Sequence, residues 1–439
     1  MDSNEFRRRR QELMNLMGPG SIAVLPAAPE RPRNRDTLYP YRQDSDFYYL
    51  TGFPEPEAVL VLIPGRDQGQ YILFCRERDP ACEIWDGPRA GQEGAVRVYG
   101  ADDAFPISDI DDILPGLIEG REKVYYTMGV DRDFDQRVIG WVNHVRQNAR
   151  SGARAPGEFV ALQHLLHEMR LIKSKAEIAA MRKAAQVSAE AHRRAMQVCR
   201  PGMLEYELEA EFQAIFRRYN GWPAYTPIVG GGANACILHY IANDQPLKDG
   251  DLVLIDAGAE IDMYAADITR TFPVNGRFNP EQRTIYELVL EAQKAAIAAI
   301  APGRHWNEFH DAATRVLTAG LVELGLLEGP VERALEQETY RRFYMHRTGH
   351  WLGMDVHDVG DYKVDGQWRL LEPGMVLTVE PGLYIAPGSE GVDPRWWGIG
   401  VRIEDNVLVT RGGCEVLTDD VPKEVEAIEA LMAEGRDGG

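Results

Sequence analysis

Two acidic residues stand at the ends of otherwise apolar segments. Asp256 closes the run Leu252–Ile255, and Glu380 closes the run Val376–Val379. A carboxylate at the end of an apolar strand would be buried as a charge, which is costly unless the group is paired or binds a metal ion. Both residues are therefore candidates for a functional site.

The two segments belong to an internal duplication. Gly250–Gly258 aligns without gaps on Gly374–Gly382, and both copies contain glycine, an apolar run, an acid, any residue and glycine. Each copy is followed by a second strand pattern that contains another acid, Asp267 in the first and Glu404 in the second. Strand pairing within each copy predicts that its two acids lie close together across the ladder.

Four clustered carboxylates would repel one another strongly, and two divalent cations would neutralise them. His350 supplies a candidate imidazole, and its neighbours Gly349 and Gly353 allow the backbone to approach a site closely. Oxygen ligands with one imidazole suit Mn, Co, Fe or Zn better than an all-sulfur site would. A single histidine considered alone could equally be structural, so the prediction depends on the whole set.

The composition excludes several classes of protein. The chain has 439 residues, with 48 Lys and Arg against 68 Asp and Glu, which gives a formal net charge of −20. Such a chain is a poor ligand for nucleic acid or an anionic membrane. The 44% hydrophobic and 26% charged residues are typical of a globular protein. No apolar stretch approaches the ~18–20 residues that a membrane-spanning helix needs, so we do not expect the chain to be an integral membrane protein.

The cysteines and the first helix indicate where the protein resides. Five scattered cysteines without a C-x-x-C pair argue against a disulfide framework and favour a reducing cytoplasm. Arg7 to Arg10 precede a polar amphipathic run without the apolar core of an export signal. We expect these arginines to form a solvated helix face.

The pattern of elements predicts an α/β (α+β) chain of two domains. Residues 1–170 read as mixed α/β, with an opening helix, a connecting helix at the end and a breaker-rich segment at 151–157. Residues 171–439 combine long helices with the duplicated strands. The predicted strands of the first domain are 21–25, 58–63, 71–74 and 124–127, and the predicted helices of the second are 174–199, 204–219, 279–301 and 306–326.

These motifs resemble the pita-bread metallopeptidases, and most closely their aminopeptidase P group, the Xaa-Pro aminopeptidases. The resemblance covers nearly the whole chain. It implies a creatinase-like N-terminal α/β domain followed by a pita-bread catalytic domain with pseudo-twofold strand hairpins. The segments that carry it are 39–47, 51–58, 255–258, 267–272, 350–358, 379–382 and 402–405.

The resemblance implies a centre of two divalent ions, usually Mn²⁺, with Co²⁺, Zn²⁺ or Fe²⁺ as alternatives. Two such ions share a water and lower its pKa, so that it can attack a carbonyl carbon as hydroxide. The implied ligand Glu380 also carries the proton to the proline nitrogen as that nitrogen leaves. The ligand set implied by the family is Asp256, Asp267, His350, Glu380 and Glu404.

Other residues match family positions around the metals. Three histidines, His239, His346 and His357, resemble those that hold the substrate and stabilise the developing oxyanion. Tyr384 resembles a family tyrosine that also lies close to the metal ligands. The alternative is that Tyr384 is an ordinary aromatic residue of the core. Strand alternation independently predicts that the guanidinium of Arg402 lies beside Glu404 and keeps it ionised.

In the first domain, Asp36 and Trp85 resemble residues that the family contributes to the substrate site of a neighbouring subunit, so a homodimer or homotetramer is implied. The alternatives are an exposed loop aspartate and a packed tryptophan. Arg347 departs from the family pattern, which has a small residue after the histidine, and this bears on the pocket wall.

The predicted function is therefore cytoplasmic, metal-dependent hydrolysis of the bond between an N-terminal residue and a penultimate proline. The closest alternative is a prolidase, which shares the fold and ligands but cleaves only Xaa-Pro dipeptides. A non-catalytic pita-bread binding protein and a creatinase-like amidinohydrolase are less favoured, because neither needs all five ligand positions filled.

Overall fold

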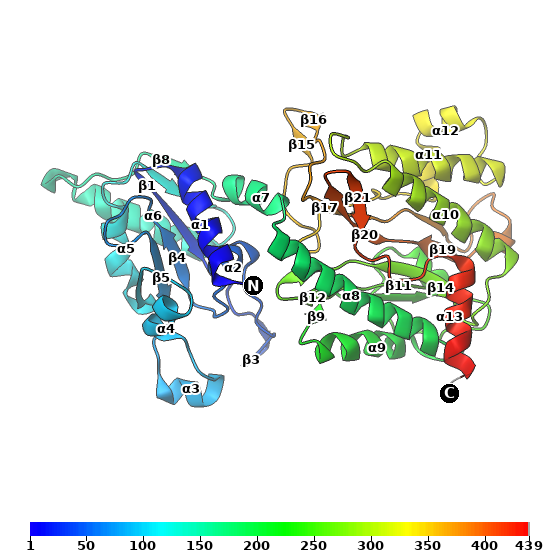
Figure 1. Cartoon of the computed structure of the whole chain (residues 1–439), viewed down its shortest axis with the longest axis horizontal. Helices are drawn as coiled ribbons and strands as arrows, with labels where there is room; N and C mark the ends of the chain where they lie inside the picture. Colours follow the sequence, from blue (N-terminus) through cyan, green and yellow to red (C-terminus); the bar gives the residue numbers. More distant parts are fainter. Residues whose placement is uncertain (438–439) are drawn as a thin grey trace. The chain divides into compact units, whose positions relative to one another are not determined.

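The structure is a computed structural model that describes residues 1–437. The chain divides into two compact units, Met1–Met169 and the part from Arg170 onward (Figure 1). Each unit has its own buried apolar core. Among the described residues, no helix is long and apolar enough to cross a bilayer.

The N-terminal unit contains a mixed six-stranded sheet with the order β6-β5-β4-β1-β7-β8. The strands are Asp103–Pro106, Tyr71–Cys75, Val59–Leu62, Ser21–Pro26, Lys123–Tyr125 and Glu158–Val160 in that order. Their apolar residues pack with α5 (Ile110–Ile118) and α6 (Arg132–Gln147). The remaining α-helices and strands are α1 (Ser3–Met17), β2 (Pro32–Asn34), β3 (Thr37–Leu38), α2 (Ser45–Thr51), α3 (Pro80–Asp86), α4 (Gly91–Arg97) and α7 (Gln163–Leu171), whose last two residues belong to the second unit.

The prediction of a solvated arginine face on α1 is wrong for two of its four residues. Arg9 and Arg10 are buried. Their guanidinium groups donate to the carbonyls of Tyr49 and Leu50, at 3.0 and 2.8 Å, near the C-terminal end of α2. They also lie 4.0 Å from the ring centroids of Tyr49 and Tyr71. Carbonyl acceptors and aromatic faces supplied by distant segments allow these charges to be buried.

The C-terminal unit is built around two nested hairpins, as the duplication predicts. In the first, β11 (Leu252–Asp256) pairs with β14 (Thr269–Pro273), and β12 (Ala259–Ile261) pairs with β13 (Tyr264–Ala265) between them. In the second, β17 (Val376–Val379) pairs with β20 (Asp405–Thr410), and β18 (Gly382–Ile385) pairs with β19 (Ile399–Arg402) between them. All four pairings are antiparallel.

Helices cover these strands. In Figure 1, α8, α9 and α13 lie on one side of the strands, and α10, α11 and α12 lie on the other. The helices are Lys175–Val198, Glu205–Arg218, Val425–Asp437, Pro280–Ala298, Glu308–Glu323 and Val331–Glu336 in that order. The remaining strands are β9 (Trp222–Pro223), β10 (Ile228–Gly231), β15 (Lys363–Val364), β16 (Gln367–Trp368) and β21 (Gly413–Val416).

The long predicted helices form where local sequence signals begin them. Ser174 and Glu177 form a capping box at the start of α8, and Asn279 and Gln282 form another at the start of α10. These reciprocal bonds satisfy backbone N–H groups that the first helical turn leaves without partners. The observed bounds of both helices agree with the predicted ranges to within a few residues.

Candidate metal centre

A cavity of about 980 Å³ in the C-terminal unit brings the five predicted metal ligands together. Three predicted histidines and Arg402 line the same cavity. An apolar wall accompanies them, formed largely by aromatic and branched side chains. The predicted residues on the lining are Asp256, Asp267, His350, Glu380, Glu404, His239, His346, His357 and Arg402.

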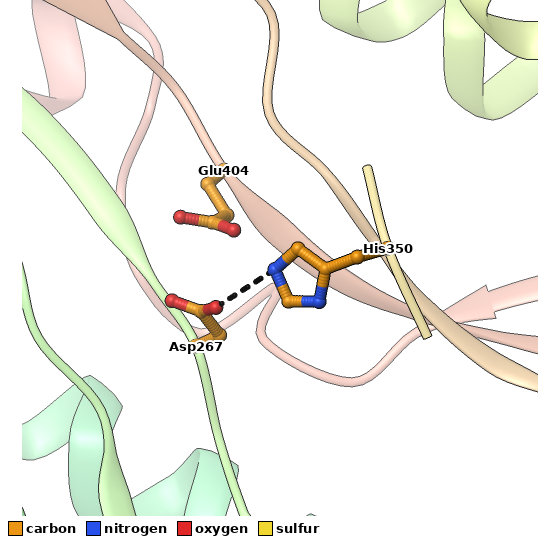
Figure 2. A group of neighbouring side chains, drawn as sticks. All are labelled: Asp267, His350 and Glu404. Atoms are coloured by element: carbon orange, nitrogen blue, oxygen red, sulfur yellow. Dashed lines mark ion pairs between the residues drawn. The ribbon is translucent and has the colours of Figure 1, made fainter. Parts of the chain in front are cut away.

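Three of these side chains form a compact group, shown in Figure 2. One potential ligand atom from each of Asp267, His350 and Glu404 lies within 4.8 Å of the other two. The Nε2 atom of His350 lies 3.3 Å from Oδ2 of Asp267 and 3.6 Å from Oε1 of Glu380. Two carboxylates and an imidazole at this spacing can surround a divalent ion.

The two hairpins explain how the carboxylates meet. Asp256 is the last residue of β11 and lies opposite Thr269, two residues after Asp267. Val379 lies opposite Asp405, so the next pair along this ladder is Glu380 and Glu404. Each hairpin therefore delivers its two acids to the same end of its ladder, as the sequence predicted.

A third segment presents His350 beside the second hairpin. Residues 348–352 run alongside β17: the N–H of Glu380 donates to the carbonyl of Thr348 at 2.7 Å, and that of Thr378 donates to His350 at 2.9 Å. This approach requires Gly349, because a Cβ atom there would lie 2.0 Å from the carbonyl oxygen of Thr378. The glycine next to the histidine therefore has the role that the sequence suggested.

A residue that the sequence did not identify joins the two acids of the first hairpin. The hydroxyl of Tyr225 lies 2.6 Å from Oδ1 of Asp256 and 2.6 Å from Oδ1 of Asp267. Burial raises the pKa of Tyr225 well above its usual value, and the two carboxylate charges add to this. Tyr225 lies in a loop between β9 and β10, where no periodicity or motif marks it.

The direct hydrogen-bond partner of Arg402 is not the predicted Glu404, although the charge of Arg402 opposes the rise that burial causes in the pKa of Glu404. Its guanidinium donates to Oδ2 of Asp256 at 2.6 Å, and its Nε donates to Oγ1 of Thr269 at 3.1 Å. The hydroxyl of Thr269 in turn donates to Oε2 of Glu404 at 2.7 Å. Glu404 follows the end of β19, so strand alternation does not continue from Arg402 to it. Arg402 therefore contacts Asp256 directly and reaches Glu404 through Thr269.

A buried ion pair links the second hairpin to the first. Arg270 and Asp405 are both fully buried and lie 2.7 Å apart. Arg270 also donates to the carbonyls of Thr269 and Glu404, at 3.0 and 2.6 Å. Asp405 accepts from Lys423 at 2.6 Å as well. Because these bonds fix backbone on both hairpins, they restrict how the acids can move relative to one another.

The electrostatics of the cluster favour bound cations. Burial raises the pKa of Glu404 well above its usual value, and the charges of Asp267 and Glu380 add to this. Burial likewise raises the pKa of Glu380 to about 7, although His350 and Arg402 oppose it. Burial alone would lower the pKa of His350, but Asp267 and Glu380 raise it to about 9. The site therefore holds more negative charge than its own side chains balance, which fits divalent metal ions.

The predicted histidines occupy different parts of the cavity. His346 lies 2.8 Å from the hydroxyl of Tyr384 through Nε2, and its Nδ1 lies 3.7 Å from Oε2 of Glu380. The ring of His357 meets that of His350 edge to face, with centroids 4.4 Å apart. His239 and His357 are both exposed on the lining. Tyr384 itself is buried and accepts from Arg402 at 3.0 Å, so it joins His346 to the arginine.

Asp36 and Trp85 belong to the N-terminal unit, and both are exposed. Trp85 is 86% exposed, which excludes the alternative of a packed core tryptophan. Neither residue is on the lining of the cavity, whose residues lie between Tyr225 and Glu404.

Comparison with known proteins assigns this site to a family. Residues 179–411 match the model of metallopeptidase family M24, and residues 6–125 match that of the aminopeptidase P N-terminal domain. The chain therefore belongs to metallopeptidase family M24. Family membership also confirms the predicted pita-bread fold, and together with the cluster of Asp267, His350 and Glu404 it supports bound divalent metal ions.

Individual relatives cover nearly the whole chain. The chain is 49% identical over 434 residues to the Xaa-Pro aminopeptidase of Escherichia coli K12, covering 98% of each. Its fold is similar to that of the aminopeptidase PepP from Pseudomonas aeruginosa, with a TM-score of 0.99 and 66% identity. The match covers 100% of this chain and 99% of that one. It is also similar to the E. coli aminopeptidase P solved with the inhibitor Pro-Leu, with a TM-score of 0.96 and 48% identity. That match covers 100% of this chain and 99% of the other.

Proposed function

We propose that the protein is a metal-dependent Xaa-Pro aminopeptidase, which hydrolyses the bond between an N-terminal residue and a penultimate proline. The observation that carries this proposal is the convergence of four carboxylates and one imidazole in a single aromatic-walled cavity. A full-length relative with the same activity in its name, 49% identical, supports it. The proposed domains are residues 1–170 and 171–439, with catalysis in the second.

We assign the metal ligands to the five clustered side chains. Two divalent ions held there would lower the pKa of a shared water and polarise the scissile carbonyl. Mn²⁺ is the proposed activating ion, with Co²⁺, Zn²⁺ and Fe²⁺ as alternatives. The proposed ligands are Asp256, Asp267, His350, Glu380 and Glu404.

Glu380 is proposed to move the proton. Its carboxylate lies between His350, at 3.6 Å, and His346, at 3.7 Å. The two imidazoles place this carboxylate where it can accept a proton and pass it on, which is the geometry that a proton carrier needs. The acceptor of that proton is the proline nitrogen, which must be protonated before it leaves as a secondary amine.

The histidines on the lining are proposed to hold the substrate. His239 and His357 can donate to the scissile carbonyl oxygen as negative charge develops on it. His346 is oriented by Tyr384, and Tyr384 by Arg402, so this chain of hydrogen bonds positions the imidazole beside Glu380. Arg402 also anchors Asp256 through its ion pair.

The apolar wall of the cavity suits the penultimate proline of the substrate. Trp306, Tyr362 and Trp368 lie on the lining, and the centroids of Trp306 and Tyr362 are 4.8 Å apart. A proline ring carries no N–H donor, so a site that accepts it must offer apolar surface in place of a hydrogen-bond acceptor.

We further propose a cytoplasmic homodimer or homotetramer. The five cysteines are all free, which supports a reducing compartment. Asp36 is exposed, and Trp85 and its neighbour Ile84 are 86% and 81% exposed; an exposed apolar patch of this kind supports a role toward a neighbouring subunit.

A small panel of peptides tests the proposed function. With Mn²⁺ added, the protein should release the first residue from Xaa-Pro-Ala and should leave Xaa-Ala-Ala essentially intact, as followed by chromatography. Cleavage of the dipeptide Xaa-Pro alone, with no turnover of the tripeptide, would instead identify a prolidase. No cleavage of either would overturn the proposal.

A further inference from the structure

Two positively charged side chains on the cavity lining form no ion pair with a carboxylate of the described residues. Arg347 and Lys363 are both exposed side chains on the lining. Among residues 1–437, neither side chain forms a hydrogen bond or an ion pair, although the backbone carbonyl of Arg347 accepts from His346 at 2.7 Å and the charge of Arg347 acts on Asp311 without forming an ion pair. The same lining carries one further acid outside the metal cluster, Asp361. Away from the cluster, the wall therefore has an excess of positive charge.

A shared tryptophan holds these two charges near each other. The guanidinium carbon of Arg347 lies 5.3 Å from the ring centroid of Trp368, and Nζ of Lys363 lies 4.4 Å from the same centroid. Lys363 is directly opposite Trp368 in the β15–β16 hairpin, which fixes the lysine over the ring. Cation–π contacts orient both side chains while leaving their N–H donors free for a ligand.

The chemistry of these donors selects a carboxylate. The planar guanidinium of Arg347 matches the two oxygens of a carboxylate, and the lysine adds a point charge. Phosphate or sulfate would be attracted too, but a peptide that enters this cavity carries carboxylates as its only common anionic groups. The metal cluster is acidic, so a peptide with an amine at one end and a carboxylate at the other matches the charges of the lining.

We propose that Arg347 and Lys363, arranged around Trp368, form a carboxylate-binding subsite that favours peptides with a carboxylate downstream of the proline. This inference rests on the proposed function and deepens it by naming a feature of the substrate. The carboxylate has two possible sources: the C-terminus of a short peptide, or an acidic side chain in a longer one.

Two matched pairs of peptides distinguish these sources. The first pair is Xaa-Pro-Ala and its C-terminal amide, which differ only in the terminal charge. The second is Xaa-Pro-Glu-amide and Xaa-Pro-Gln-amide, which differ only in the side-chain charge. Because both cations are exposed, we expect kcat/KM to favour the charged member of at least one pair by about fivefold, mainly through KM.

The variants test whether these residues cause the preference. Arg347→Gln combined with Lys363→Gln should abolish the preference by raising KM for the charged peptide, and should leave turnover of the uncharged peptide unchanged. The matched control is Arg395→Gln, which removes an arginine 5.0 Å from the ring of Trp396 that is not on the cavity lining. That control should retain the preference, and its unfolding curve provides the reference for the double variant.

Other outcomes would overturn the inference. A wild-type protein that cleaves charged and uncharged members of both pairs equally well has no such subsite, although its Xaa-Pro activity would stand. A double variant that retains the wild-type preference, or that loses activity equally on all four peptides, assigns the effect to other residues. A wild-type protein that cleaves none of the four would overturn the proposed function and this inference together.

Discussion

The side-chain amide of Asn406 forms two hydrogen bonds with the backbone of Asp267, one as acceptor and one as donor. Its Oδ1 accepts from the N–H of Asp267 at 3.0 Å, and its Nδ2 donates to the carbonyl oxygen of the same residue. Nearby, the N–H of Glu404 donates to the carbonyl of Thr269 at 3.0 Å. The amide of Asn406 thus extends the backbone link between the two hairpins to Asp267 itself.

Replacing Asn406 should therefore loosen the metal centre. Asn406→Ala leaves the buried N–H and carbonyl of Asp267 without partners, and we expect it to lower the free energy of unfolding by about 2–4 kcal/mol. The affinity for Mn²⁺, measured by calorimetry, should fall about tenfold or more because Asp267 is no longer fixed. The control Asn143→Ala, at an exposed position of α6, should change neither quantity. Unchanged metal affinity in Asn406→Ala would contradict the positioning role.

The hydroxyl of Tyr225 should matter for metal binding as well. Tyr225→Phe removes a hydroxyl that contacts both Asp256 and Asp267, at 2.6 Å each. The two carboxylates then lose an oriented donor, so we expect affinity for divalent ions to fall by about ten- to a hundredfold. The replacement keeps the ring, so the free energy of unfolding should fall by no more than about 1–3 kcal/mol through the lost hydroxyl. A variant that binds Mn²⁺ as tightly as the wild type would show that the contact has no such effect.

Glu205 should act on the segment that carries His239. Its buried carboxylate accepts four hydrogen bonds, which hold the chain on both sides of that histidine. The donors are the N–H groups of Gly231 and Gln245, the amide of Asn234 and the hydroxyl of Tyr240. Glu205→Gln replaces one acceptor oxygen by a donor, so two of these bonds are lost.

We expect Glu205→Gln to raise KM for Xaa-Pro-Ala several-fold and to destabilise the fold by about 1–3 kcal/mol, while the affinity for Mn²⁺ stays unchanged. Steady-state kinetics and calorimetry on the same preparation check these quantities. Glu291→Gln, at an exposed helical position, is the control. If kcat fell with KM unchanged, the positioning of a substrate-binding histidine would be the wrong explanation.

A buried ionic group predicts how stability depends on pH. Asp358 accepts from Lys173 at 2.8 Å and from Arg170 at 2.6 Å. Burial alone would raise the pKa of Asp358, but these two cations lower it below its usual value. The pKa of Asp358 is lower in the folded than in the unfolded chain. Its ionised carboxylate therefore stabilises the fold above the unfolded pKa near ~4, and this contribution is lost as pH falls through the pKa of the folded state.

Urea unfolding across pH tests this. Asp358→Asn should lower the free energy of unfolding at pH 7 by about 3–5 kcal/mol, because it removes the buried carboxylate that Lys173 and Arg170 share, although Arg170 also bonds to Asp355 at 2.8 Å. The difference between variant and wild type should shrink below pH ~4. Asp67→Asn, on an exposed loop, should follow the wild type at every pH. A deficit that stays constant down to acid pH would exclude the titration of Asp358 as its cause.

Much of the fold could be predicted because local patterns specify it. The apolar runs that end in Asp256 and Glu380 mark both hairpins, and the caps at Ser174 and Asn279 mark two long helices. These signals depend on neighbours in sequence, so no tertiary information is needed to detect them. The alternation of residues along each strand then places the two acids of a hairpin at the same end of its ladder.

The parts that could not be predicted depend on contacts between distant segments. Tyr225 meets Asp267 across 42 positions of the chain, and nothing near it in sequence indicates that contact. Arg402 bonds to Asp256 across 146 positions, whereas alternation pointed to Glu404, two residues away. Arg9 is buried because a helix 40 residues later supplies its acceptor. In each case the decisive partner is determined by tertiary packing.

The central claim is that this chain cleaves Xaa-Pro peptides through two divalent ions held by its acidic cluster. The most direct measurement titrates Mn²⁺ into chelator-treated protein and follows both binding heat and release of the first residue from Xaa-Pro-Ala. We predict that activity is absent without metal and reaches its maximum as two ions bind per chain, and that Glu404→Ala loses both. Full activity in the metal-free protein, or wild-type turnover by Glu404→Ala, would contradict the account.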